Sequence, residues 1–295
     1  MIARERLIAL LFVLPAVLLV GLFVFWPTVS MARTSLHQQR LTDAQTGPFC
    51  GGENFRAVWD DPDFRTAARN TAYFAVLVVP LQTALALALA VWVNAPGRWT
   101  RGLRLALFLP TTLSLTVVAV LWDLLYEPAQ ASGSGLFNGL LGALGLPGQP
   151  FLTSPAQAMP CLAAMSIWQG VGFQMMILLA GLQSVSGELY EAAALDGARR
   201  WGRFVHVTLP GIAPTLALVL MITTIFALKL FVQPYLMTGG GPQGATRSVV
   251  QYMFEAAFSR RDLGLACAAG VLFFVAVAVV AGVQRRLFRS AEALT

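Results

Sequence analysis

Long apolar runs alternate with short polar segments along most of the chain. Six of these runs are at least about 20 residues long, the length at which an α-helix crosses the hydrocarbon core of a bilayer. They cover approximately residues 7–31, 71–94, 104–126, 158–181, 212–237 and 264–284. The pattern predicts an all-α integral membrane protein with six transmembrane helices, because a helix satisfies all of its own backbone hydrogen bonds in lipid.

Proline interrupts several of the runs, which predicts kinked helices. The prolines are Pro15, Pro27, Pro80, Pro110 and Pro214.

We divide the chain into an N-terminal end with the first helix (1–34), an external loop (35–69), a five-helix core (70–288) that contains a cytoplasmic loop (186–210), and a cytoplasmic tail (289–295).

Composition excludes a soluble domain. Hydrophobic residues make up 57% of the 295 residues and charged residues 12%, with a mean hydropathy of +0.69. The first apolar run could be mistaken for a signal peptide, but it is long enough to span and lacks a clear small-residue cleavage site, so we expect a retained helix. The three cysteines, Cys50, Cys161 and Cys267, lie in separate segments and predict neither a disulfide framework nor a metal site.

The net charge of +6 comes from nineteen arginines and one lysine against fourteen acids. Eleven arginines lie at the N-terminus, in the loop near Arg101, in the loop near Arg200 and in the tail. The opposite loops hold eight, several of them beside acids, and residues 127–157 have none. The positive-inside rule therefore predicts that both termini and the loop 186–210 are cytoplasmic. No basic stripe with interleaved aromatics indicates nucleic-acid binding.

The loop 186–210 is a polar, alanine-rich segment between two apolar runs. Ser186 can cap a helix whose positive end Glu188 and Glu191 complement, and Asp196 can pair with the arginines three and four residues later. Gly202 and Pro210 predict a bend and a short second helix. Alanines are too small to build a core, so this segment suits contact with another protein, although an ordinary amphipathic connector at the membrane surface has the same features.

The spacing of this loop resembles the EAA loop of bacterial ABC importer permeases. The matching positions are Glu191-Ala192-Ala193, Gly197, Val207 and Leu209-Pro210, with valine where that family usually has isoleucine. In the family this loop is the coupling helix that docks on the ATP-hydrolysing subunit. The resemblance implies an ATPase-coupling role for Glu188, Glu191, Ala192, Ala193, Asp196, Gly197, Leu209 and Pro210.

Three further motifs resemble carbohydrate-type permeases. Residues 235–242, Tyr-x-x-Thr-Gly-Gly-Gly-Pro, are similar to the end of the fifth helix in the MalF type, and Gly51-x-x-Asn54-Phe55 and Asn70-Thr71 match its weaker signatures. Val232 stands where many relatives have aspartate. The resemblance covers about residues 7–288 and implies the type I ABC importer permease fold.

The family resemblance implies a transport subunit in the bacterial inner membrane that imports a carbohydrate, such as a sugar, oligosaccharide or glycerol-phosphate-like solute, by alternating access. It also implies three kinds of partner: a second permease of the MalG type, two copies of an ATPase and an extracytoplasmic solute-binding protein. The chain itself would bind no cofactor, and the ATPase would use ATP and Mg.

Catalytic motifs are missing from the sequence. Residues 239–246 have the glycine spacing of a phosphate-binding loop, but Ala245 replaces the required lysine, and Lys229 is the only lysine in the chain. His37 and His206 belong to no metalloprotease motif. We therefore expect a non-enzymatic subunit whose energy comes from a partner.

Polar residues inside the apolar runs are candidates for the substrate path: Lys229, Gln233, Tyr235, Gln174 and Trp168. Lys229 could contact a hydroxyl-rich or anionic substrate, pair structurally with Asp123, or extend to the membrane surface, and the amides could equally join helices. An ion-coupled secondary transporter remains the alternative, as does a non-transporting membrane scaffold. Asp123, near an edge, is the only acid we place within a span, whereas an ion-coupled transporter needs carboxylates near the bilayer midplane.

Overall fold

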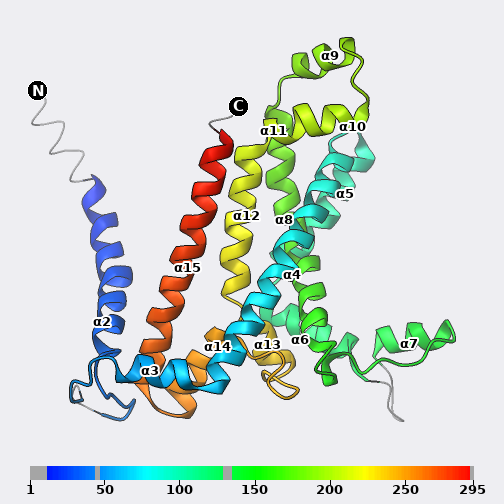
Figure 1. Ribbon diagram of the computed structural model, residues 1–295. Coiled ribbons are helices and arrows are strands. Elements are labelled where there is room, and N and C mark those ends of the chain that lie inside the picture. The colour runs from blue at the N-terminus through cyan, green and yellow to red at the C-terminus, as the bar shows by residue number, and fades with distance from the viewer. Residues whose placement is uncertain (1–11, 44–46, 129–134, 293–295) are drawn as a thin grey trace, which may run out of the picture. The chain divides into compact units, whose positions relative to one another are not determined.

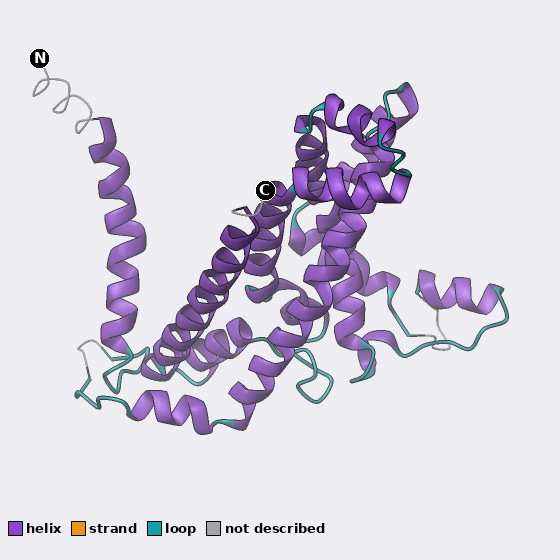
Figure 2. Ribbon diagram, turned by 45° about the horizontal axis from the view of Figure 1, so that its top comes forward, coloured by secondary structure: helices purple, strands orange, loops and turns teal. Residues whose placement is uncertain are grey.

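The computed structural model describes residues 12–43, 47–128 and 135–292, with side chains up to 288. The predicted start of the first helix with Arg4 and Arg6, residues 293–295 of the predicted tail and the side chains of 289–292 lie outside this description. Every regular element of the described residues is helical (Figures 1 and 2). The elements are η1 Gly21–Phe25, α2 Trp26–Thr34, α3 Glu53–Asp60, α4 Pro62–Val93, α5 Arg98–Phe108, η2 Leu109–Thr112, α6 Leu115–Leu125, α7 Leu136–Ala143, η3 Phe151–Thr153, α8 Ala158–Ser184, α9 Gly187–Leu195, α10 Arg200–Arg203, η4 Phe204–Thr208, α11 Leu209–Gly211, α12 Ala213–Leu228, α13 Val232–Met237, α14 Val249–Phe254, η5 Glu255–Ser259 and α15 Leu263–Glu292.

Within the described residues, five helical segments are long and apolar enough to cross a membrane, and a bent helix pair is a sixth candidate. The five are Phe12–Thr34, Pro62–Val93, Ala158–Ser184, Ala213–Met237 and Leu263–Phe288. The prediction of an all-helical membrane protein is confirmed. The second span begins nine residues earlier than the apolar run, because Pro62 and Asp63 start the helix in its polar flank.

The third apolar run, predicted as one kinked helix over 104–126, is two helices that meet at 98°. α5 passes into the 3₁₀ turn η2, and the backbone is then extended at Leu113 and Ser114, with ψ of 144° and 132°. Pro110 cannot donate the hydrogen bond that would continue α5. The break is therefore sharper than the predicted kink, and the run is two helices instead of one.

The fifth run is also discontinuous. α12 ends at Leu228 and α13 begins at Val232. Lys229 is the C-cap of α12, with φ −81° and ψ 20°, so the prediction that it lies inside a helix is wrong. Phe231, at φ −150° and ψ −56°, turns the chain before α13 starts.

The chain forms two compact units, one from residues 1–64 and 252–275 and one from 65–251 and 276–295. α8 lies at the centre of the second, larger unit, where it contributes to two apolar clusters. One joins it to α4, α6 and α13, and the other to α4 and α12. Glycines permit this close packing: a Cβ on Gly172 would overlap the Leu107 carbonyl oxygen, and one on Gly181 would lie 2.7 Å from the Thr215 hydroxyl.

Two sequence signatures meet in the larger unit. Asn70 Nδ2 donates to the carbonyls of Gly244 and Arg247 at 2.7 and 3.0 Å, and the Thr71 hydroxyl accepts the backbone N–H of Val249 at 3.0 Å. The loop after α13 is thus fastened to α4. The glycine-rich segment that imitates a phosphate-binding loop has a structural role here, since Thr246 closes it internally by donating to the Gly241 carbonyl at 2.8 Å.

A charged network holds the smaller unit together. Asp61 Oδ2 accepts hydrogen bonds from Tyr252 and Arg260, each at 2.8 Å. Burial alone would raise the pKa of Asp61, but these bonds and the Asp63 backbone N–H outweigh it and hold the pKa below its usual range. The network therefore contributes stability above about pH 4, the ordinary value for Asp, and loses it as the pH falls through the lowered pKa.

Candidate functional site

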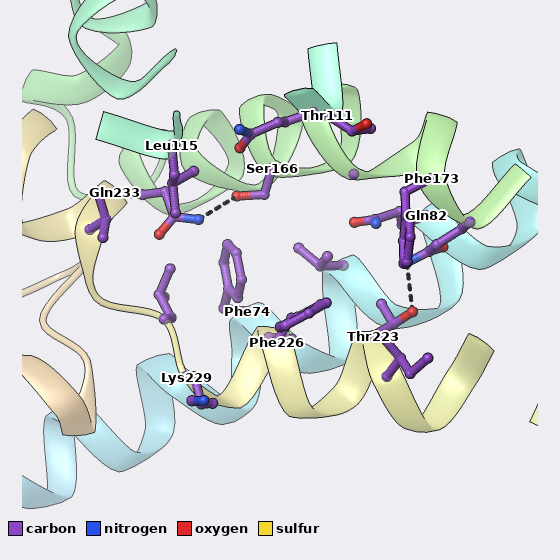
Figure 3. A pocket seen from close by; sticks show the side chains of 18 of the residues that line it. Phe74, Gln82, Thr111, Leu115, Ser166, Phe173, Thr223, Phe226, Lys229 and Gln233 are labelled. Carbon is purple, nitrogen blue, oxygen red and sulfur yellow. Dashed lines mark hydrogen bonds between the residues drawn. The ribbon is translucent and has the colours of Figure 1, made fainter. Parts of the chain in front are cut away.

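The larger unit contains a cavity of about 550 Å³ between its helices (Figure 3). Elements α4, α5, η2, α6, α8, α12 and α13 all contribute to its wall. The lining combines neutral hydrogen-bonding groups with aromatic rings. The hydrogen-bonding groups come from Gln82, Thr111, Thr112, Ser166, Gln169, Gln174, Thr223 and Gln233, and the rings from Phe74, Phe108, Phe173 and Phe226.

Both helix breaks of this unit face the cavity. Thr111 and Thr112 come from the 3₁₀ turn between α5 and α6, and Lys229 and Val232 flank the gap between α12 and α13. Irregular backbone at membrane depth is tolerated where it is buried in protein or lines a cavity, and broken helices mark solute sites in several transporter folds. The breaks therefore identify this cavity as the site to examine.

Hydrogen bonds between helices hold several amide and hydroxyl side chains of the cavity lining in place. Gln174 is 3% exposed, and its Nε2 donates to Thr223 Oγ1 at 2.6 Å, while its Oε1 has no partner among the described residues. Gln233 Nε2 donates to Ser166 Oγ at 3.2 Å, which links α13 to α8 (Figure 3). Gln174 thus offers an unused acceptor, and such groups suit a ligand with many hydroxyls.

Among the described residues that line the cavity, Lys229 is the one with an ionisable side chain. Asp123, considered above as its structural partner, lines a different cavity together with Glu127 and Thr238. In the described part of the chain no ion pair joins Lys229 to Asp123.

Two of the five predicted path residues lie elsewhere. Trp168 packs against Trp122, with ring centroids 5.5 Å apart, and lines a separate apolar cavity of about 240 Å³. Tyr235 stacks on Phe231 at 5.1 Å and is not part of the lining. The cavity brings together Gln174, Lys229 and Gln233.

The predicted coupling segment forms a short helix, α9, that projects from one end of the larger unit (Figure 1). The Ser186 hydroxyl accepts the Glu188 N–H at 3.3 Å and caps its start. At its end Gly197 has φ +76°, and the N–H groups of Gly197 and Ala198 donate to the carbonyls of Ala194 and Ala193 at 3.1 and 2.9 Å. This is a complete Schellman motif, which requires a left-handed residue at Gly197.

Most of α9 is open to contact. Glu188, Glu191 and Ala192 are exposed, and Leu195 is 90% exposed. The helix is anchored through Tyr190, whose hydroxyl lies 3.1 Å from Thr208 Oγ1 in η4.

The polypeptide bends at Gly197 and not at Gly202, which the sequence had suggested and which lies inside α10. Asp196 is the C-cap of α9 and makes no ion pair with Arg199 or Arg200 among the described residues. The π-helical turn η4 leads into α11, where Leu209 and Pro210 are half-buried.

Comparison with known protein families identifies the family of this chain. The family model described as binding-protein-dependent transport system inner membrane component matches residues 5–292. The chain belongs to this family. It is therefore a multi-pass inner-membrane permease subunit of an ABC importer, which hydrolyses no ATP itself and depends on an ATPase partner that uses ATP.

Relatives of this permease resemble it over nearly its full length. The sulfoquinovosyl glycerol transport permease SmoG of Agrobacterium fabrum is 34% identical over 290 residues, which are 98% of this chain and 92% of SmoG. The trehalose/maltose permease MalF of Thermococcus litoralis is 33% identical over 93% of this chain and 91% of its own length. A chain of a crystallised bacterial ABC transporter that imports the acidic polysaccharide alginate matches with a TM-score of 0.84 at 25% identity, covering 98% of this permease and 97% of that chain.

Sequence reasoning missed most of the cavity lining. It did not single out Gln82, Thr111, Thr112, Ser166 or Thr223. All five are polar positions inside apolar runs, and Thr111 and Thr112 directly follow Pro110, so a search for polar residues next to membrane prolines would have found two of them.

Proposed function

We propose that this permease carries a carbohydrate through the cavity between α4, α8 and α12. The observation that carries the proposal is the lining itself. Amides and hydroxyls can donate to and accept from the hydroxyls of a sugar, and the phenylalanine rings can cover its apolar C–H faces. Relatives named for sulfoquinovosyl glycerol, trehalose/maltose and lactose transport support the same class of solute.

Transport would proceed by alternating access, with the energy supplied by a partner ATPase. α9 presents exposed glutamates and small alanines on a short helix that is fixed at both ends, which suits rigid docking in a cleft of an ATPase. Closure of that ATPase would move α9 and, through α10, η4 and α11, the start of α12. The second half of α12, from Ile222 to Ala227, lines the cavity. Glu191 and Gly197 are the positions on which we expect this coupling to depend.

The assembly that we propose has two permeases, this chain and one of the MalG type, with two copies of an ATPase and an extracytoplasmic solute-binding protein. The arginine distribution supports an orientation with both termini and α9 in the cytoplasm. Ion-coupled secondary transport is the rival mechanism. It is disfavoured because no acid is among the residues that line the cavity in the described structure.

The decisive experiment purifies the chain from native membranes in mild detergent, identifies the bound proteins and measures ATPase activity in wild type, Glu191→Lys and Glu127→Lys. Glu127 is exposed just after the end of α6, an element that lies away from α9 (Figure 1), so its charge reversal is the matched control. We expect an ATPase and a second permease to copurify, and Glu191→Lys alone to lose the ATPase or its substrate-stimulated activity. Full coupling in Glu191→Lys refutes the role of α9, and purification without any ATPase refutes the importer.

A further inference from the structure

The cavity has an unbalanced charge. Among the twenty residues that line it, Lys229 is cationic and all others are neutral. A cation at membrane depth is costly unless it is hydrated, paired or able to reach the surface. A site built only for neutral hydroxyl groups has no need of such a residue, because the amides and hydroxyls already provide donors.

The surroundings of Lys229 compensate only part of this charge. Its ammonium makes no hydrogen bond or ion pair within the described chain. As the C-cap of α12 it lies at the negative end of a helix dipole, which is equivalent to about half an elementary charge. The side chain is exposed at the cavity, and Figure 3 shows it at the end of α12, across the open space from Ser166.

We infer that the carbohydrate carries an anionic group, such as a carboxylate, sulfonate or phosphate ester, and that the Lys229 ammonium binds it. This inference rests on the carbohydrate function proposed above and narrows it. The anionic group would complete the coordination of Lys229, while Gln174 and Gln233, on the facing helices, receive the hydroxyls. Charge-assisted hydrogen bonds are roughly twice as strong as neutral ones, so Lys229 would set preference between charged and neutral sugars.

The neighbouring residue Val232 allows a direct test of charge balance. It also lines the cavity and lies three positions after Lys229, at the start of α13. An acid at this position would provide Lys229 with an internal counterion in place of the one that the substrate brings. Val232→Asp should therefore weaken binding of anionic sugars without removing Lys229.

The experiment measures binding to the permease–ATPase complex in nanodiscs without the binding protein, so that the latter's own specificity does not filter the ligands. The probes are two pairs of a neutral hexose and its uronate, glucose with glucuronate and galactose with galacturonate, together with glucose 6-phosphate. Saturation-transfer NMR measures the binding of each probe. Wild type should prefer anionic members. Lys229→Met should weaken them by about tenfold or more and leave neutral sugars unchanged, Lys229→Arg should retain the preference, and Val232→Asp should reduce it.

The outcomes separate the inference from the function on which it rests. Equal weakening of charged and neutral sugars by Lys229→Met, with an unchanged melting temperature, overturns the inference and assigns Lys229 a structural role. Preference for neutral sugars in wild type also overturns it, while the carbohydrate function stands. Binding of no sugar by a complex that still hydrolyses ATP contradicts the proposed function itself.

Discussion

Gln174 combines a hydrogen bond between two helices with a place in the lining of the cavity that we propose as the solute path. Its amide nitrogen is committed to Thr223 of α12, which in turn donates to the Val219 carbonyl at 2.6 Å. Its carbonyl oxygen is buried and has no partner within the described residues, and the residue itself is among those that line the cavity. A buried acceptor without a partner costs free energy, so a ligand hydroxyl that donates to it gains correspondingly.

We predict that Gln174→Leu raises the KM for transport about three- to tenfold, the effect of one neutral hydrogen bond. Thr223→Val is the matched control, because it removes the partner of the amide nitrogen but leaves the Gln174 carbonyl oxygen in place. Uptake by proteoliposomes that contain the complete transporter gives KM, and thermal melting reports stability. If both variants lose stability equally and neither changes KM, Gln174 only joins α8 to α12.

The residues that line the cavity were harder to predict from the sequence than the helices that carry them. Apolar runs and their polar interruptions identified Gln174, Gln233 and Lys229, because an amide or amine in an apolar run is conspicuous. They could not distinguish this cavity from other interhelical spaces. Trp168, which packs at a tilt against Trp122, and Tyr235, which stacks on Phe231, were predicted for the path but do not line this cavity. That distinction depends on how the helices pack, which their sequence period does not specify.

At the scale of elements, two helix breaks lie at the cavity that we propose as the solute path. The run 104–126 and the run 212–237 each have the hydropathy of one span, yet each is divided where it meets the cavity. Hydropathy averages over a window and is insensitive to a change of direction within it. Pro110 indicated the first break. The second, at Lys229, lies far from Pro214, and Pro234 follows it inside α13.

α9 is the element whose start was most directly predictable from its own sequence. Its cap at Ser186 was predicted and is confirmed, and its end depends on a residue with positive φ. At Gly197 a side chain would oppose the left-handed backbone at a cost of about 1–2 kcal/mol, and the end of α9 would fray.

We predict that Gly197→Ala lowers substrate-stimulated ATPase activity severalfold without reducing the amount of permease in the membrane. Gly197→Asp should abolish the stimulation. Gly187→Ala is the control, since Gly187 lies in the first turn of the same helix with no heavy atom within 4 Å of an added Cβ. ATPase assays on the purified complex test this, and normal stimulation in Gly197→Asp would show that the shape of α9 does not matter for coupling.

The whole molecule leaves much apolar surface uncovered. Most large side chains along Phe12–Thr34 are exposed, as are Val275 and Val279 of α15. Lipid and a second permease can cover such surface, and the length and composition of the runs predicted it well. Sidedness, in contrast, rests on the positions of the arginines alone, because hydropathy has no direction.

We predict that α7 and α9 lie on opposite sides of the membrane. In a background with Cys50→Ser, Cys161→Ala and Cys267→Ala, a matched pair of single cysteines is introduced at Leu136 and Leu195, which are 57% and 90% exposed. A membrane-impermeant maleimide added to intact spheroplasts should label Leu136→Cys, and Leu195→Cys should be labelled only in inside-out vesicles. Labelling with the opposite sidedness would invert the topology.

The near absence of lysine makes this permease a natural single-site chemical probe. Lys229 is the only side-chain amine in the chain, and it lies open at the cavity. Within this chain a water-soluble acylating reagent therefore finds one side-chain amine without any engineering, and the rate at which that amine is modified from each face of the membrane measures to which side the cavity is open. Comparing those rates with and without ATP would follow the opening and closing of the transporter in real time through a single native atom, the Nζ of Lys229.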